Sequence, residues 1–191
     1  MRLREPSLRG TSVYLRPLLH SDAHDLLALR LRNREFFTPF EPIPDRRHFT
    51  LEGQLEEIDQ ALEDARMDRR YAFGIFTSVG DEVAGRIALS NIARGAWQNA
   101  TVGYYVGQAW ANRGYATEAV QLVLRFAFAD ASLHRLQAGV LPENVASARV
   151  LEKAGFRREG VSLRYLKING AWRDHLMFAV TVEEWEEAEF P

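Results

Sequence analysis

Arg113, Gly114 and Ala116 occupy a short loop between an aromatic, β-branched run and an amphipathic stretch. Apolar residues recur in that stretch at intervals of three and four, which predicts a helix with one buried face: Ala119, Leu122, Val123, Phe126 and Ala127. A small-residue turn at a helix N-terminus presents unpaired N–H groups and a positive dipole end, and such turns bind phosphate. The dipole contributes only about 0.3–1 kcal/mol, so converging amides must supply most of the binding. The alternative interpretation is an ordinary strand–helix connection.

A second candidate segment begins another predicted helix. One face of this helix carries a hydroxyl within an apolar stripe: Ser147, Val150, Leu151 and Ala154. A hydroxyl in such a place needs a hydrogen-bond partner, and the ordinary partner is a backbone carbonyl one turn back. Asn144 is the expected cap of the helix, and Gly155 its expected end.

Glu41 is a candidate proton acceptor because it stands alone in an apolar segment stiffened by prolines, residues 36–44. Partial burial there would raise its pKa toward the range in which a carboxylate acts as a general base. The alternatives are exposure to solvent or an ion pair with Arg46 or Arg47. We expect segment 36–44 to lack regular structure, since three prolines interrupt it.

Composition narrows the class of protein. The 191 residues, 47% hydrophobic and 26% charged, fit one soluble domain spanning residues 1–191. A net charge of −2 argues against a nucleic-acid partner. The sequence contains neither a membrane span nor the apolar core of a signal peptide, so we expect a cytoplasmic protein. The absence of cysteine excludes disulfides and a Cys nucleophile, and the five histidines lack ligand spacing, which predicts no metal site.

The remaining elements alternate along the chain. Strands are expected at residues 13–16, 71–77, 82–91, 135–141, 156–166 and 172–182, and helices at 22–32 and 50–68. The solvent face of the second of these helices should carry four carboxylates: Glu52, Glu56, Glu57 and Glu63. The last two strands turn at Asn169-Gly170, and there Asp174 and His175 either shape a pocket or only hold the hairpin. This order predicts an α+β fold with a single mixed sheet flanked by helices.

These segments resemble motifs of the GNAT acyltransferases. Residues 113–116 are similar to the end of the pyrophosphate-binding loop, and residues 141–156 to the helix that packs along the pantetheine arm and thiol of acetyl-CoA. The resemblance, which runs from residue 13 to 182, implies the GNAT fold with acetyl-CoA as cosubstrate. The cofactor-binding residues it implies are Tyr104, Tyr105, Val106, Asn112, Arg113, Gly114, Tyr115, Ala116, Thr117 and Asn144.

The chain departs from the family pattern in the loop and in the second helix. Ala111 stands where Gln or Arg is usual, and Asn112 where Gly is common. Many GNAT enzymes carry a tyrosine at the position of Leu151, which has no proton to give to the departing thiolate. Ser147 is then the best candidate donor, directly or through a water molecule, and its hydroxyl would meet the sulfur of CoA.

The resemblance also places an oxyanion site. The family fold splays two strands, and a main-chain N–H at residues 104–106 would stabilise the oxyanion. Tyr104 and Tyr105 point to opposite faces of that strand, so only one is expected to line the cleft. The candidates for contacts with the CoA phosphates are Arg113, Arg149 and Arg157, which are otherwise solvated surface charges.

Residues 32–42, 90–104 and 165–175 resemble the RimJ branch of the family, whose members acetylate protein N-termini. The implied reaction is direct attack by a protein N-terminal amine in a ternary complex, without a covalent enzyme intermediate. An α-amine has an ordinary pKa near 8 against about 10.4 for Lys, a gap worth about 3.4 kcal/mol, so a weak base suffices. A small-molecule amine acceptor, another donor such as succinyl-CoA, and a non-catalytic acyl-CoA-binding protein remain alternatives. A homodimer also stays open.

Overall fold

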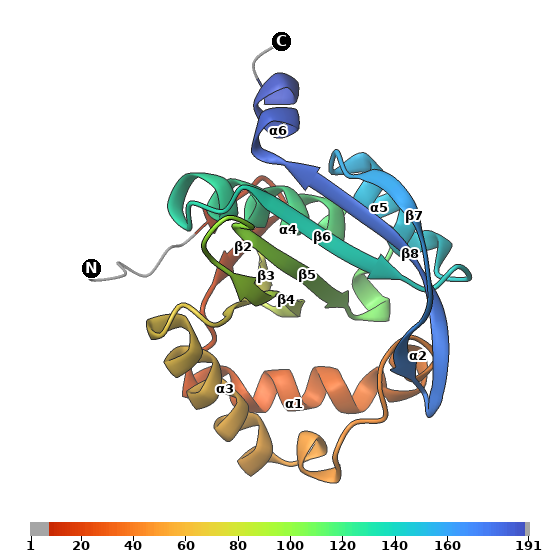
Figure 1. The fold of residues 1–191 in the computed structure, drawn as a ribbon. Helices are drawn as coiled ribbons and strands as arrows, with labels where there is room; N and C mark the ends of the chain where they lie inside the picture. The colour runs from red at the N-terminus through yellow and green to blue at the C-terminus, as the bar shows by residue number, and fades with distance from the viewer. Residues whose placement is uncertain (1–7, 190–191) are drawn as a thin grey trace.

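A computed structural model describes residues 8–189 as one eight-stranded sheet with helices packed on both faces (Figure 1). The strand order is β1-β2-β3-β4-β5-β6-β8-β7, and the only parallel neighbours in it are β5 and β6. This arrangement confirms the predicted α+β class with a single mixed sheet. Residues 1–7, part of the segment in which the sequence predicted no signal peptide, lie outside the described residues.

The strands are β1 Leu8–Arg9, β2 Val13–Arg16, β3 Tyr71–Thr77, β4 Val83–Ala93, β5 Asn99–Val106, β6 Arg135–Val140, β7 Arg157–Ile168 and β8 Ala171–Thr181. The helices are α1 Ala23–Arg32, α2 Arg34–Phe37, α3 Leu51–Arg66, α4 Tyr115–Arg125, α5 Val145–Lys153 and α6 Val182–Glu189. The predicted strands and helices are confirmed to within a few residues at their ends. The turn at Asn169-Gly170 is confirmed as well, with a positive φ at both residues.

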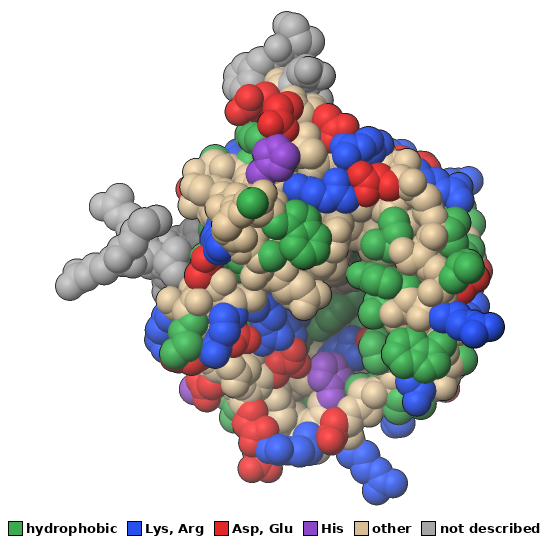
Figure 2. Space-filling view, in the orientation of Figure 1, with side chains coloured by type: hydrophobic (Ala, Val, Ile, Leu, Met, Phe, Trp, Pro, Cys, Tyr) green, Lys and Arg blue, Asp and Glu red, His purple; other side chains and the backbone are tan. Residues whose placement is uncertain are grey.

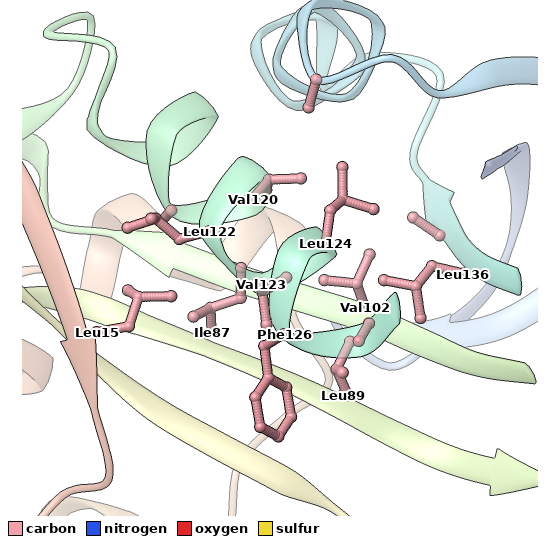
Figure 3. Packing of buried hydrophobic residues seen from close by; sticks show 14 of the residues in the cluster. Leu15, Ile87, Leu89, Val102, Val120, Leu122, Val123, Leu124, Phe126 and Leu136 are labelled. Carbon is pink, nitrogen blue, oxygen red and sulfur yellow. The ribbon is translucent and has the colours of Figure 1, made fainter. Parts of the chain in front are cut away.

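Two apolar clusters hold the helices to the sheet, one on each face. The larger cluster packs α4 and α5 on the sheet, and Figure 3 shows its central side chains: Ile87, Leu89, Val102, Val120, Val123 and Phe126. All five residues of the predicted stripe on α4 are buried. The smaller cluster packs α1 and α3 on the opposite face, with Leu26, Leu29 and Ile58 at its centre.

The two central strands separate part-way along the sheet. β5 pairs with β6 only at Asn99, Ala100 and Thr101. Beyond Thr101, β5 continues along β4 as far as Val106, whereas β6 continues along β8. The sheet therefore opens between β5 and β6, which confirms the splayed strands that the family resemblance implied.

Segment 36–44 is more regular than the sequence predicted. α2 extends through Phe37, and a 3-10 turn follows at Thr38–Phe40. Pro39 lies in the first turn of that 3-10 element, where a missing N–H costs no intrahelical bond. The prediction is wrong for residues 36–40 and correct for the stretch from Glu41 to Asp45, which has no helix or strand.

Within the described part of the chain, no helix combines the length and the apolar character needed to cross a membrane. No group of three or more His, Asp or Glu side chains in residues 8–189 is arranged to hold a metal ion.

Candidate active site

A cavity of about 430 Å³ lies where β5 and β6 separate. Its wall includes Ser147 and Leu151 of α5 from one face of the sheet, and Phe37, Glu41 and Glu57 from the other. Figure 2 shows a hollow in the middle of this side of the molecule, with hydrophobic side chains gathered toward the β7–β8 hairpin. Because both faces contribute to one cavity, molecules that enter from the two sides of the sheet can meet there.

On the α5 side, Ser147 and Tyr104 form a pair of hydroxyls. Ser147 Oγ lies 2.9 Å from Tyr104 Oη, which is also 3.1 Å from the Ser147 carbonyl oxygen. The phenol has one proton and donates to one of these oxygens at a time. When it donates to Oγ, the Ser147 proton is free to point elsewhere. The partner of the hydroxyl in this structure is therefore a side chain of β5, and not the carbonyl one turn back that was the ordinary alternative.

Burial raises the pKa of Tyr104 to about 12, against the opposing effect of its hydrogen bond with Ser147. The phenol is therefore protonated at neutral pH. Leu151, which stands at the position of the usual GNAT tyrosine, is fully buried and lines the same cavity. A phenol is thus present in this site, but β5 supplies it instead of α5.

Asn144 has the capping role that the sequence predicted. Its Oδ1 accepts a hydrogen bond from the Ser147 amide at 3.1 Å, at the first turn of α5. The same side chain lines the cavity. The cap therefore fixes the turn of helix that carries Ser147, since it binds the amide of that residue.

On the opposite face, Glu41 is paired with Arg30 of α1. Arg30 Nη2 lies 2.8 and 2.9 Å from the two carboxylate oxygens, and the arginine side chain is only 3% exposed. The rings of Phe37 and Tyr105 lie against the same guanidinium. Neither alternative for Glu41, exposure to solvent or an ion pair with Arg46 or Arg47, is observed, because the carboxylate turns inward to α1.

Glu57 of α3 lies in the cavity wall, so its predicted place on the solvent face is wrong. Its carboxylate pairs with Arg86 of β4 and lies 3.4 Å from His48 Nδ1. Burial acts to raise the pKa of Glu57, but the hydrogen bond from His48 and the charge of Arg86 outweigh it and lower the pKa to about 2. The sequence offered no signal for this place: Glu57 shares a helical face with Gln54, which is also polar and whose burial is visible only in the structure.

Two arginines also line the cavity, Arg70 and Arg86, and they bear on the alternative of an acidic donor such as succinyl-CoA. Arg86 pairs with Glu57, and Arg70 Nε lies 3.2 Å from Asp64. Both cations are engaged by carboxylates of α3, so they tie that helix to the sheet. This pairing leaves little positive charge for an acidic acyl group.

Tyr104 and Tyr105 point to opposite faces of β5, as strand alternation predicted. Tyr104 packs against the cluster under α4 and α5, and Tyr105 against the cluster under α1 and α3. Both side chains nevertheless line the cavity, so the prediction that only one would do so is wrong. The cavity crosses the sheet beyond the last β5–β6 pair and therefore receives side chains from both faces.

The loop before α4 has the backbone geometry of an anion site. Gly114 is the N-cap in the left-handed region, with φ 81°, and Asn112 has φ 59°. The first backbone bond of the helix runs from Glu118 N to Gly114 O at 3.0 Å. Three amides precede it and meet no backbone acceptor within residues 8–189: Tyr115, Ala116 and Thr117.

The three arginines that were candidates for contacts with the CoA phosphates lie in different parts of the structure. Arg113 is exposed in the loop, Arg149 is exposed on α5, and Arg157 pairs with Glu159 and Glu184. Neither the α4 loop nor Val106, which pairs with Gly85, belongs to the cavity wall. α4 does pack beside α5, so the loop and the cavity are linked through neighbouring helices.

The sequence left open whether Asp174 and His175 shape a pocket or only hold the hairpin, and the structure gives each residue one of these roles. Asp174 Oδ1 accepts a hydrogen bond from Arg164 N at 2.7 Å and so holds β7 to β8. His175 is 2% exposed and lines the cavity. The first residue stabilises the hairpin, and the second belongs to the site.

Similarity to known proteins confirms the resemblance to the GNAT family. Residues 12–157 match the family described as Acetyltransferase (GNAT) domain. The probable N-acetyltransferase YjcK of Bacillus subtilis is 44% identical over 173 residues, covering 91% of this chain and 96% of that protein. The [Ribosomal protein uS5]-alanine N-acetyltransferase of Escherichia coli is 31% identical over 186 residues, 96% of each chain. The structure of Mycobacterium smegmatis RimJ in complex with CoA-disulfide superposes with a TM-score of 0.86 at 35% identity, covering 90% of this chain and 83% of that one.

The fold and the matched domain define an acetyl-CoA-dependent N-acetyltransferase, and the chain belongs to the GNAT family. Within that family it is related to RimJ along almost its whole length.

Proposed function

We propose that this enzyme acetylates the N-terminal α-amine of a protein by direct attack of the amine on acetyl-CoA. The observation that carries the proposal is the cavity through the sheet, with hydroxyls on its α5 face and carboxylates on its α1–α3 face. The relation to an enzyme named for the alanine of ribosomal protein uS5 supports a protein N-terminus as acceptor.

The donor enters from the α5 face in this proposal. The three free amides at the start of α4, together with Asn112, Arg113 and Gly114, bind the pyrophosphate of acetyl-CoA. Asn144 meets the pantetheine arm while it caps α5, and a main-chain N–H of β5 on the edge that β6 leaves after Thr101 polarises the thioester carbonyl. Ser147 donates its proton to the departing sulfur and regains one from Tyr104.

The acceptor enters from the α1–α3 face. Glu57 is ionised there at neutral pH, and Glu41 contributes a second carboxylate to the same cavity wall. Both attract the ammonium form of an amine, because opposite charges interact more strongly in a partly dry site. Phe37 and Phe40 form the apolar part of the wall and suit the short side chain of a first residue such as alanine.

The test is thiol release from acetyl-CoA with a matched set of acceptors. One peptide begins with a free Ala and contains an internal Lys, a second has the same sequence with a blocked N-terminus, and spermidine and free lysine complete the set. We expect turnover with the free peptide alone. Turnover with spermidine or lysine alone would reassign the enzyme to small amines, and CoA binding without any turnover would favour a binding protein.

A further inference from the structure

We propose that His175 is the general base that takes the proton from the attacking amine. The inference rests on the amine transfer proposed above and adds a catalytic residue that neither the motifs nor the comparisons assign. It starts from the position of the side chain: His175 lies on β8, is 2% exposed and lines the cavity. An imidazole is the side chain that exchanges protons most readily near neutral pH.

A hydrogen bond to the backbone fixes which nitrogen of His175 can accept a proton. Nδ1 lies 3.0 Å from the carbonyl oxygen of Arg173, and a carbonyl can only accept, so Nδ1 carries the proton in the neutral ring. The lone pair of the neutral imidazole is then on Nε2. This is the tautomer that a general base requires, and a main-chain group of β8 holds it.

His175 also lies on the face of the sheet from which we propose that the amine enters. The next residue, Leu176, packs against the cluster under α4 and α5, so strand alternation turns His175 to the α1–α3 face. Gly139 of β6 confirms this direction, because a Cβ added there would lie 3.5 Å from His175 Cδ2. His175 therefore lies on the acceptor side of the opening, and Ser147 lies on the donor side.

The groups around the imidazole come from β7, β8 and the turn before α5. The ring of Tyr165 from β7 packs edge-on against it, with centroids 5.5 Å apart. Asp174 of β8 accepts a hydrogen bond from the β7 backbone, and Arg173 pairs with Glu143 in the turn before α5. The charged side chains next to His175 in the chain and in this turn are therefore already engaged by partners of their own.

The cavity wall contributes the remaining charged groups. Glu41 and Glu57 face the cavity from the α1–α3 side, but each is engaged by an arginine, Arg30 or Arg86. Both oxygens of Glu41 already accept from Arg30, a permanent cation. The Glu41 carboxylate is therefore already engaged, whereas no hydrogen bond within residues 8–189 engages His175 Nε2, which leaves His175 as the base.

His175 and Ser147 together account for every proton that moves in the transfer step. The amine nitrogen forms a bond to the thioester carbonyl carbon, and the carbon–sulfur bond breaks. His175 Nε2 takes one proton from the nitrogen, and the sulfur receives one from Ser147. The imidazolium then releases its proton to solvent, and Ser147 is reprotonated through Tyr104 from solvent. An acceptor that arrives as ammonium loses one further proton to water before attack.

The test compares His175→Asn with wild-type enzyme in the thiol-release assay on the Ala peptide. Asparagine keeps an N–H near the place of Nδ1 and removes the basic nitrogen. We expect kcat to fall about 10²-fold or more, with CoA binding and the unfolding temperature unchanged. The rising limb of kcat against pH should move to higher pH. The matched control is His134→Asn, an exposed histidine that pairs with Glu183 outside the cavity, which should behave as wild type.

Glu41→Gln separates the two candidate bases in the same assay. We expect it to raise the KM of the peptide while the midpoint of the pH profile stays in place. The inference fails if His175→Asn keeps kcat within about threefold of wild type, or loses activity equally at every pH. It also fails if Glu41→Gln, and not His175→Asn, moves the pH profile. A wild-type enzyme with no turnover on any amine would instead reject the proposed function.

Discussion

At the scale of single residues, the proton donor that we propose depends on a pair that joins distant parts of the chain. Ser147 alone is a weak acid, but Tyr104 lies 2.9 Å from its oxygen and is protonated at neutral pH because burial raises its pKa to about 12. The phenol can therefore return a proton to Ser147 after the serine has donated. In our proposal the pair takes the place of the tyrosine that many GNAT enzymes carry at the position of Leu151.

Removing the hydroxyl at residue 147 should slow the chemical step without weakening the donor. For Ser147→Ala we expect kcat to fall about 10²-fold with the Kd for CoA unchanged, because only the proton transfer is lost. Tyr104→Phe should cause a smaller loss, since Ser147 can still draw a proton from water. Steady-state kinetics and CoA titration of both variants check this, and full activity in Ser147→Ala would remove the serine from the mechanism.

At the scale of elements, two features of the sheet and its connections create the site. β5 leaves β6 after Thr101, which opens the cavity, and the loop after β5 starts α4 with free amides. Gly114 permits that start because its φ of 81° falls in the left-handed region, which side chains with a Cβ avoid. The site that we propose for the phosphates of CoA is therefore built from backbone and not from a cluster of cations.

A methyl group at Gly114 should weaken CoA binding. No atom lies within 4 Å of a Cβ built there, so Gly114→Ala clashes with nothing and costs only the backbone strain of about 1–2 kcal/mol. We expect the Kd for CoA to rise about tenfold, by calorimetry, as the loop relaxes away from its geometry. Gly80→Ala is the matched control: φ is 92° in the β3–β4 turn, so the strain is similar, but CoA affinity should not change. Equal affinities in both variants would contradict a phosphate site at this loop.

The elements themselves were largely predictable, because their signals are local. The Asn169-Gly170 turn, the Asn144 cap and the stripe on α4 each depend on residues a few positions apart. The hydrogen-bond and ion-pair partners in the candidate site were not predictable. Tyr104 and Ser147 are 43 residues apart in the sequence and meet only when β5 packs beside α5. The same holds for Glu41, which lies in a loop and whose partner Arg30 belongs to α1.

At the scale of the whole molecule, ion pairs join the acceptor-side helices to the sheet. Glu57 binds α3 to β4 through Arg86, whose side chain is 10% exposed, and Arg30 binds α1 to the loop that contains Glu41. The backbone N–H of Asn169 donates to the Glu41 carbonyl at 3.0 Å, so the final hairpin holds the same loop. These contacts fix the acceptor half of the cavity against the donor half.

The Glu57 contact should make stability depend on acid pH. Its pKa is lowered from 4.5 to about 2 on folding, so its contribution is present above about pH 4.5 and is lost as the pH falls toward 2. The shift corresponds to about 3 kcal/mol at neutral pH. We expect Glu57→Gln to unfold more easily at pH 7, with the difference from wild type shrinking between pH 5 and about pH 2 in urea titrations. A difference that stays constant over this range would show that the carboxylate charge is not the cause.

The most direct measurement is to locate the transferred acetyl group by fragment mass spectrometry. The acceptor is a peptide with a free N-terminal Ala and an internal Lys, incubated with acetyl-CoA and the enzyme. The account predicts one acetyl group, on the α-amine of Ala, and none when that amine is blocked. Acetyl on the Lys side chain, or on free spermidine but not on the peptide, would contradict N-terminal acetylation as the function.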